Sequence, residues 1–325
     1  MPRTAAALVQ KVVICVGAVA LALCSLTSMA TAFETIREAQ DPRGLFWDSQ
    51  SGYLYYTDRA EDRVGRWKSG DPEPFVSTKS CGPTAIARAD KTFVIACHVG
   101  GYLLVVDASG RELQRVVQDA DGHRLSTPYA LAGDGHGVYV VESGAFSTTA
   151  PATGVLYYWK PGGKLEPMVT GFRYPAGVVL DQANSRLLVS EQFGQQILSF
   201  PVMGPGDLDA AGVSVFADIG ALLNLGNASA GPQGLAIDEW TGTIYAAIYG
   251  DGFLAMFQHD GKMLGGYLLP MQLVSGVVFP KGSDNPLFVS GVDDELGDRP
   301  GFIAQAFPDF LITMPSEEKG EDDSD

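Results

Sequence analysis

Seven polar side chains recur at matching places along this sequence and could together do chemistry. Carboxylates beside an imidazole can bind a divalent cation or transfer protons, and a guanidinium can hold the carboxylate of a ligand. The candidate ligand-binding residues are Arg43, Asp58, His98, Tyr129, Glu142, Glu191 and Gln233. A structural alternative stays open for each, because strand-end polar groups also cap loop amides and pair with one another.

Familiar catalytic motifs are missing from the sequence. It contains no Gly-x-Ser-x-Gly nucleophile elbow, no Cys/His spacing for zinc and no phosphate-binding glycine loop. We therefore assign no catalytic residue from the sequence. Any enzymatic activity would have to come from the polar residues named above.

A repeated pattern positions these residues. A turn, often Pro-x-Gly, precedes a short apolar strand, a second turn, and a strand rich in β-branched and aromatic residues. The copies begin 41 to 57 residues apart, at Pro42, Pro83, Pro128, Pro175, Pro232 and Val274. Each copy has room for two more strands, and four short antiparallel strands per repeat are typical of a propeller blade. The sequence predicts an all-β fold, a six-bladed β-propeller over residues 33–315.

Propeller geometry converts a position in the repeat into a position in space. The residue after each repeat proline and the residue that ends each second strand should meet at one mouth of the central channel. We expect Arg43, Tyr129 and Gln233 to point into one polar pocket there, with Glu142 and Glu191 nearby. The long loops expected over this mouth, as lids or specificity loops, are 143–154, 217–231 and 291–301.

Two segments compete to close the ring. Residues 33–37 could complete the sixth blade beside residues 301–307, and residues 310–313 could take the same place. The pattern of apolar residues does not decide between them.

The first 32 residues are typical of a secretory signal peptide. A basic start with Arg3 and Lys11 precedes an apolar run that is short for a membrane span, and small residues lead to a cleavage site after Ala32. An uncleaved anchor and a lipoprotein attached through Cys24 are the alternatives. We predict a secreted or periplasmic protein with no membrane span after cleavage.

Composition narrows the possible partners. The chain of 325 residues is 46% hydrophobic and carries a formal net charge of -16, which argues against binding nucleic acid. Residues 316–325 lack apolar side chains and are expected to be a disordered acidic tail. We expect a monomer whose partner is an unknown small molecule or protein at the channel mouth.

Two cysteines remain after signal cleavage, Cys81 and Cys97. Export places them in an oxidising compartment, where a pair of this kind forms a disulfide. Two buried free thiols are the alternative. The repeat register places both residues near one rim of blade two.

Several segments resemble the senescence-marker-protein/gluconolactonase (SGL, LRE-like) family of six-bladed propellers. The segments that carry the resemblance are 95–98, 105–110, 122–128, 139–141, 171–180 and 232–238. The resemblance covers nearly all of the mature chain. Paraoxonases, strictosidine-synthase-like proteins and NHL-type propellers share the pattern and stay open as alternatives.

The resemblance implies a lactonase that depends on Ca²⁺ or Zn²⁺, yet the implied ligand positions depart from the family pattern. The metal-binding Glu falls on Arg43, the substrate-binding Asn on Tyr129, the metal-binding Asn on Ala176 and the metal-binding Asp on Gln233. A one-residue shift could recruit Asp41 or Glu38 but would not restore all four positions. We therefore expect the family metal site to be lost and no cofactor to be bound.

Two functions remain open from the sequence. The first is a propeller that binds a small molecule or partner at the channel mouth. The second is a hydrolase of lactones or related esters, which would use a shifted Ca²⁺ or Zn²⁺ ion or a metal-free Glu/His/Arg site. The altered ligand positions favour the first.

Overall fold

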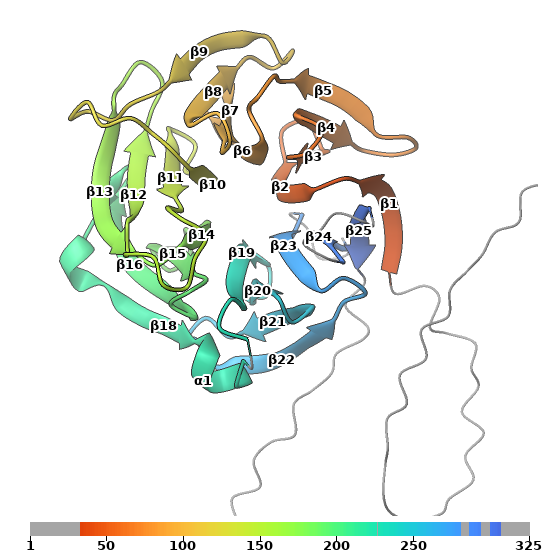
Figure 1. Cartoon of the computed structure of the whole chain (residues 1–325), viewed down its shortest axis with the longest axis vertical. Helices are drawn as coiled ribbons and strands as arrows, with labels where there is room; N and C mark the ends of the chain where they lie inside the picture. Colours follow the sequence, from red (N-terminus) through yellow and green to blue (C-terminus); the bar gives the residue numbers. More distant parts are fainter. Residues whose placement is uncertain (1–32, 226, 281–285, 294–299, 307–325) are drawn as a thin grey trace, which may run out of the picture. The chain divides into compact units, whose positions relative to one another are not determined.

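Clusters of β-branched and aromatic residues between Gly, Asp and Pro turns form the strands, as the repeats predict. The computed structural model describes residues 33–225, 227–280, 286–293 and 300–306. The strand pairs are antiparallel, and the sheets surround a common centre (Figure 1). The prediction of an all-β, propeller-like fold is therefore confirmed.

Within the described residues, four blades are separate sheets whose strands follow one another outward. Blade one consists of β2 (Pro42–Asp48), β3 (Tyr53–Asp58), β4 (Arg63–Trp67) and β5 (Glu73–Ser77). Blade two consists of β6 (Pro83–Ala89), β7 (Thr92–Cys97), β8 (Tyr102–Val106) and β9 (Glu112–Val116). Blade three consists of β10 (Pro128–Gly133), β11 (Val138–Glu142), β12 (Gly154–Trp159) and β13 (Leu165–Phe172). Blade four consists of β14 (Pro175–Asp181), β15 (Arg186–Glu191), β16 (Gln196–Gly204) and β18 (Ser214–Asp218).

Short elements follow β16 on the way to the next innermost strand. They are β17 (Asp207–Leu208), which pairs with the end of β16, the 3-10 turn η1 (Ala210–Gly212) and the helix α1 (Ile219–Leu223). No helix in the described part of the chain has the length and apolarity needed to cross a lipid bilayer.

The other eight strands form one continuous sheet in the described chain, where the sequence predicted two separate blades. One half consists of β19 (Gly231–Ile237), β20 (Ile244–Tyr249), β21 (Phe253–Phe257) and β22 (Met263–Leu268). The other half consists of β23 (Leu273–Val278), β24 (Leu287–Val292), β25 (Gly301–Ala306) and β1 (Phe33–Ala39). The halves join because Tyr249, at the end of β20, pairs with Leu273, at the start of β23. The prediction of six separate blades is wrong in this respect.

Strands from the two ends of the described chain lie side by side. β1 pairs with β25 from Phe33 opposite Ala306 to Ala39 opposite Gly301. This is the first of the two closures that the sequence allowed. The competing segment 310–313, the predicted signal peptide 1–32 and the predicted acidic tail 316–325 lie outside the described residues.

The innermost strands β2, β6, β10, β14, β19 and β23 contact one another in a closed circle. At the start of each, the register with the second strand of the same repeat is irregular. A bulge of this kind takes a residue out of the pairing and re-aims its side chain. The residues after three of the repeat prolines, Arg43, Tyr129 and Gln233, lie at these irregularities and face one cavity.

Neighbouring innermost strands approach too closely for a side chain at four of these bulges, which carry Gly44, Gly177, Gly234 and Gly276. A Cβ atom at Gly44 would collide with the carbonyl oxygen of Thr84, and one at Gly177 with the carbonyl oxygen of Gln233. Glycine at these positions therefore sets how closely the strand starts can gather around the centre.

Interlocking apolar side chains between sheets hold this arrangement. The largest fully buried side chains include Trp159, Tyr56, Tyr139, Phe93, Phe200 and Phe257. Burying one such ring contributes about 2–3 kcal/mol. The strand ends that form the site therefore project from a rigid framework.

Candidate functional site

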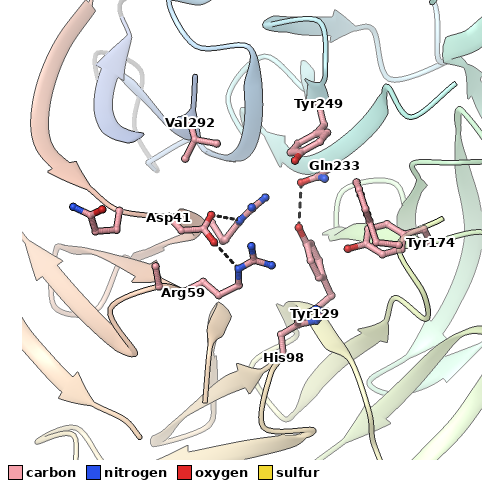
Figure 2. A pocket seen from close by; sticks show the side chains of 12 residues that line it. Asp41, Arg59, His98, Tyr129, Tyr174, Gln233, Tyr249 and Val292 are labelled. Atoms are coloured by element: carbon pink, nitrogen blue, oxygen red, sulfur yellow. Dashed lines mark hydrogen bonds and ion pairs between the residues drawn. The ribbon is translucent and has the colours of Figure 1, made fainter. Parts of the chain in front are cut away.

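A cavity of about 490 Å³ lies at one mouth of the ring (Figure 2). Its lining residues are Gln40, Asp41, Arg43, Arg59, Ala60, His98, Tyr129, Phe146, Tyr174, Gln233, Tyr249 and Val292. Four of the seven candidate residues are in this set: Arg43, His98, Tyr129 and Gln233. The structure thus brings these four together, and their role in binding a ligand stays a prediction.

An ion network occupies one side of the cavity. Asp41, directly before the repeat proline of blade one, contacts the Nε atoms of Arg43 at 2.6 Å and Arg59 at 2.5 Å. The side chains of Arg43 and Asp41 are only 10% and 14% exposed, whereas that of Arg59 is 33% exposed. Burial opposes the charge of Arg43, but Tyr129, Asp41 and Tyr249 outweigh burial and raise its pKa. Two permanently charged guanidinium groups therefore face a single carboxylate among the lining residues.

A relay of hydrogen bonds fixes the polar groups across from this network. The Tyr129 hydroxyl donates to Oε1 of Gln233 at 3.3 Å, and Nε2 of Gln233 donates to Oε1 of Gln192 at 2.7 Å. Nε2 of Gln192 in turn donates to the carbonyl oxygen of Ser229 at 2.7 Å. Figure 2 shows Tyr129 and Gln233 pointing toward each other. The amide of Gln233 is thus already engaged on both of its ends.

Aromatic rings form a second wall of the cavity (Figure 2). Ring centroids are 5.7 Å apart for Tyr129 and Tyr174, and 5.0 Å apart for Phe146 and Tyr174. Phe146 also approaches Tyr249 at 6.3 Å, and it is 49% exposed despite its size. Burial raises the pKa of Tyr174, so its hydroxyl stays neutral. Phe146 belongs to the 143–154 loop that the sequence assigns to this mouth.

His98 contributes a neutral ring to the lining. Its imidazole stands edge-on to Tyr129, with the ring centroids 5.4 Å apart. Burial lowers the pKa of His98 from 6.5 to about 4, and the positive charges of Arg59 and Arg43 act in the same direction. His98 therefore adds no charge to the cavity at neutral pH.

The other three candidates, Asp58, Glu142 and Glu191, are buried and do not line the cavity. Each ends the second strand of its blade and accepts hydrogen bonds from the backbone that leads into the first strand. We call these three side chains the carboxylate caps. Asp58 accepts from the backbone N–H groups of Gln40 and Asp41 at 3.2 and 3.1 Å.

The other two caps follow the same plan. Glu142 accepts from the backbone N–H groups of Ser126 at 2.5 Å and Thr127 at 2.8 Å, and from the Tyr157 hydroxyl at 3.1 Å. Glu191 accepts from the backbone N–H of Arg173 at 2.6 Å. The structural alternative that the sequence left open for these carboxylates is the arrangement found here.

Blade two closes the equivalent junction with a covalent bond. Cys97 pairs with Pro83 in the register in which Asp58 pairs with Pro42 and Glu142 with Pro128. Cys97 forms a disulfide with Cys81, with Cα atoms 4.4 Å apart, and both residues are fully buried. The predicted disulfide is confirmed, and the alternative of two free thiols is wrong.

Some lining residues were absent from the sequence-based candidates: Asp41, Arg59, Phe146, Tyr174 and Tyr249. The repeat alignment could have revealed Arg59. Asp58 and Cys97 are equivalent strand ends, so Arg59, which follows Asp58, is equivalent to His98, which follows Cys97. An alignment of the second strands on Asp58 and Cys97 would have made Arg59, instead of Asp58, the candidate in blade one. The aromatic residues of the loops carry no comparable signal.

The four positions to which the gluconolactonase-like resemblance assigns ligands lie at the same end of the ring. Arg43, Tyr129 and Gln233 line the cavity, and Ala176 lines the narrow channel segment that continues from Arg43 and Tyr129. Ca²⁺ and similar hard cations need several oxygen ligands with negative charge among them. A guanidinium, a methyl group, a phenol and one engaged amide do not fit that requirement.

An all-β propeller with a polar cavity at one mouth is the class of protein that the fold and the site define. Residues 42–292 match the family described as "SMP-30/Gluconolactonase/LRE-like region", and the chain belongs to this family. The resemblance stated from the repeats is thereby confirmed.

Curated relatives at low identity include proteins named "Lactonase drp35". The one from Staphylococcus saprophyticus is 25% identical over 227 residues, which cover 68% of this chain and 66% of that protein. The one from Staphylococcus aureus strain USA300 is 25% identical over 239 residues, which cover 70% of this chain and 69% of that protein. The matched region thus spans about two thirds of the length of these relatives.

Solved structures share the fold. A gluconolactonase from Xanthomonas campestris superposes with a TM-score of 0.67 at 20% identity, covering 85% of this chain and 89% of that chain. A calcium-binding protein, regucalcin, from Agrobacterium tumefaciens superposes with a TM-score of 0.66 at 17% identity, covering 85% and 95%. At these identities the likeness concerns the fold alone.

Proposed function

We propose that this SMP-30/gluconolactonase-family propeller binds a small molecule in the channel-mouth cavity without the family metal. One observation carries the proposal: the Arg43–Asp41–Arg59 network stands at the cavity wall. A cation about 4 Å from a guanidinium is repelled by roughly 4 kcal/mol per unit charge at an effective dielectric of about 20. A divalent ion would feel about twice that repulsion, and Asp41 already serves two guanidinium groups.

The proposal includes the setting in which the propeller works. We propose that residues 1–32 are removed on export and that the mature protein acts outside the cytoplasm as a monomer. The Cys81–Cys97 disulfide supports this, because such bonds persist in oxidising compartments.

A metal-free lactone or ester hydrolase is the second candidate. The placement of His98 and Arg43 in one cavity favours it, since one could act as a base and the other could stabilise an oxyanion. A general base works best with a pKa near the working pH, and the pKa of His98 lies at about 4. The weak basicity of His98 makes the binding function the better supported one.

Calorimetry with Ca²⁺ and Zn²⁺, combined with a panel of lactones, tests the proposal. We expect no micromolar metal binding at the mouth and no metal-dependent lactone hydrolysis. Micromolar binding that disappears in Asp41→Asn would overturn the proposal and revive a metal-dependent hydrolase.

The matched control for this experiment is Asp121→Asn. Asp121 lies in a cluster with Asp119 and His123 that could hold a metal ion, and none of these three residues lines the cavity. Metal binding that survives Asp41→Asn but is lost in Asp121→Asn would lie outside the mouth and leave the proposal intact.

A further inference from the structure

The cavity lining carries one uncompensated positive charge in a protein whose net charge is strongly negative. Arg43 and Arg59 share the carboxylate of Asp41, and His98 is neutral because its pKa is lowered to about 4. Asp58, which lies behind Asp41, contacts Arg63 at 3.5 Å, and Arg63 also pairs with Glu61; none of these three residues lines the cavity. The lining is therefore suited to a ligand with a single negative charge.

Arg59 is the member of this network that can reach a ligand. Its side chain is 33% exposed, whereas that of Arg43 is 10% exposed. Asp41 contacts the Nε atom of each guanidinium. The planar group of Arg59 can still donate from its terminal nitrogens, which matches the two oxygens of a carboxylate.

The aromatic side chains of the cavity indicate which uncharged group the rest of the ligand carries. Tyr129, Tyr174 and Tyr249 lie around the cavity, with Asp41 and Arg59 across from Tyr174 (Figure 2). Phe146 extends this wall and keeps 49% of its surface exposed. A half-exposed aromatic ring at the edge of a cavity gains contact area and stacking when a flat apolar group covers it.

We propose that the cavity binds a small organic monocarboxylate with a planar aromatic or conjugated body. Its carboxylate pairs with Arg59, and its planar body lies against Phe146 and the neighbouring tyrosines. A cavity of about 490 Å³ has room for such a ligand. The inference rests on the proposed small-molecule function and names its ligand class. A dianionic phosphate would leave one negative charge unpaired, and an uncharged sugar lactone would use neither the cation nor the aromatic wall.

Calorimetry on the full chain with three matched probes tests the ligand class. The probes are cinnamate, its neutral analogue cinnamamide, and hexanoate, which keeps the carboxylate but lacks the planar body. We expect cinnamate to bind about tenfold more tightly than either of the others, since each of these lacks one of the two interactions. Equal affinity for cinnamate and cinnamamide, or no binding of cinnamate at millimolar concentration, would overturn the inference.

Variants assign the two interactions to residues. Arg59→Gln should weaken cinnamate binding about tenfold without changing cinnamamide binding, and Arg59→Lys should recover part of the loss. Phe146→Ala should weaken both aromatic probes by the same factor. Unchanged cinnamate affinity in Arg59→Gln would refute the assignment of the carboxylate.

The matched control is Arg66→Gln. Arg66 is also paired with a carboxylate, Glu73, and lies 4.7 Å from the ring of Tyr53, but it does not line the cavity. Arg66→Gln should leave the affinities for all three probes unchanged. If Arg66→Gln weakened cinnamate binding as much as Arg59→Gln does, that result would count against a specific site. Selective binding of a lactone with required Ca²⁺ would instead refute the proposed function itself, so the two failures are distinguishable.

Discussion

Blades two and three join their first two strands at the channel mouth by different chemistry. In blade three, Glu142 accepts hydrogen bonds from the backbone of Ser126 and Thr127. In blade two, the equivalent strand end is Cys97, and it is bonded covalently to Cys81. Both junctions hold the approach to an innermost strand against the end of the second strand.

The difference teaches that this position has a structural role whatever residue fills it. A carboxylate is useful there because it accepts from several backbone donors at once, which would otherwise be buried without partners. A disulfide fixes the same two segments but needs an oxidising environment. Buried acidic residues near a channel mouth can thus serve the fold. In blades one and two, the next residue along the strand lines the cavity: Arg59 follows Asp58, and His98 follows Cys97.

Removing the cap of blade three should have the largest effect on stability. Glu142→Ala leaves two backbone N–H groups and the Tyr157 hydroxyl without their acceptor, which we expect to cost about 4 kcal/mol. Glu142→Gln keeps one acceptor oxygen and should cost about half as much. Urea unfolding measures both values. A loss below about 1 kcal/mol in Glu142→Ala would show that the cap matters little.

Removing the disulfide should cost somewhat less. Cys81 and Cys97 are 16 residues apart, and a loop of that length corresponds to about 3 kcal/mol in the chain-entropy model. We expect Cys81→Ala/Cys97→Ala to lose this amount and to become insensitive to reductant, whereas the native protein should lose stability when reduced. Equal stability of the two proteins under oxidising conditions would contradict the comparison.

The residues next to the two kinds of junction should respond differently to pH. In blade two, His98 has a folded pKa of about 4, below the usual 6.5, so the unfolded chain binds more protons between these values. The contribution of His98 to the free energy of unfolding should therefore be complete above about pH 6.5. As the pH drops through 4, the free energy of unfolding should fall by up to roughly 3 kcal/mol. The counterpart of His98 in blade one is Arg59, which is not a histidine.

His98→Gln should flatten this part of the stability profile, measured by urea unfolding at intervals between pH 4 and 7. His136→Gln removes a solvent-exposed histidine and should leave the slope as it is in the native protein. If His98→Gln keeps the full slope, the histidine is not its source.

Transferring the disulfide of blade two to the equivalent positions of blade three should have the smallest effect on stability. Ser126 and Glu142 occupy the places in blade three that Cys81 and Cys97 occupy in blade two. We expect Ser126→Cys/Glu142→Cys to form a second disulfide and to stay within about 1 kcal/mol of the native protein, since the bond replaces the lost cap. Thiol titration after denaturation should find no free cysteine at positions 81, 97, 126 and 142. Two reactive thiols would mean that the junctions differ in geometry.

Much of the fold followed from the sequence because the repeat is local. Turns and β-branched runs mark each innermost strand of the described chain, and prolines mark all of them but β23. These signals placed Arg43, Tyr129 and Gln233 at one mouth. The joining of two predicted blades into one sheet did not follow, because it depends on a contact between separate segments. Gly250 and Gly252 donate to the carbonyl oxygen of Gln272, which draws β20 and β23 together.

The candidate site was predicted only in part for a similar reason. Strand periodicity shows that a side chain alternates between faces, but an irregular register at each strand start shifts the alternation by one. Asp58, Glu142 and Glu191 were therefore expected beside the cavity, and Arg59 was missed. Phe146 reaches the cavity from a loop, where no periodic pattern applies.

The pairing of β1 with β25 determines when β1 can complete its hydrogen bonds during biosynthesis. β1 is the first described strand to be made, yet its partner follows roughly 260 residues later. At roughly 5–20 residues per second, β1 waits about 13–50 s for β25. During that interval, β1 exposes the backbone groups that will pair with β25, and such unpaired groups invite pairing with other chains. A cell that makes this protein must therefore keep β1 from pairing with a wrong partner until β25 has been made.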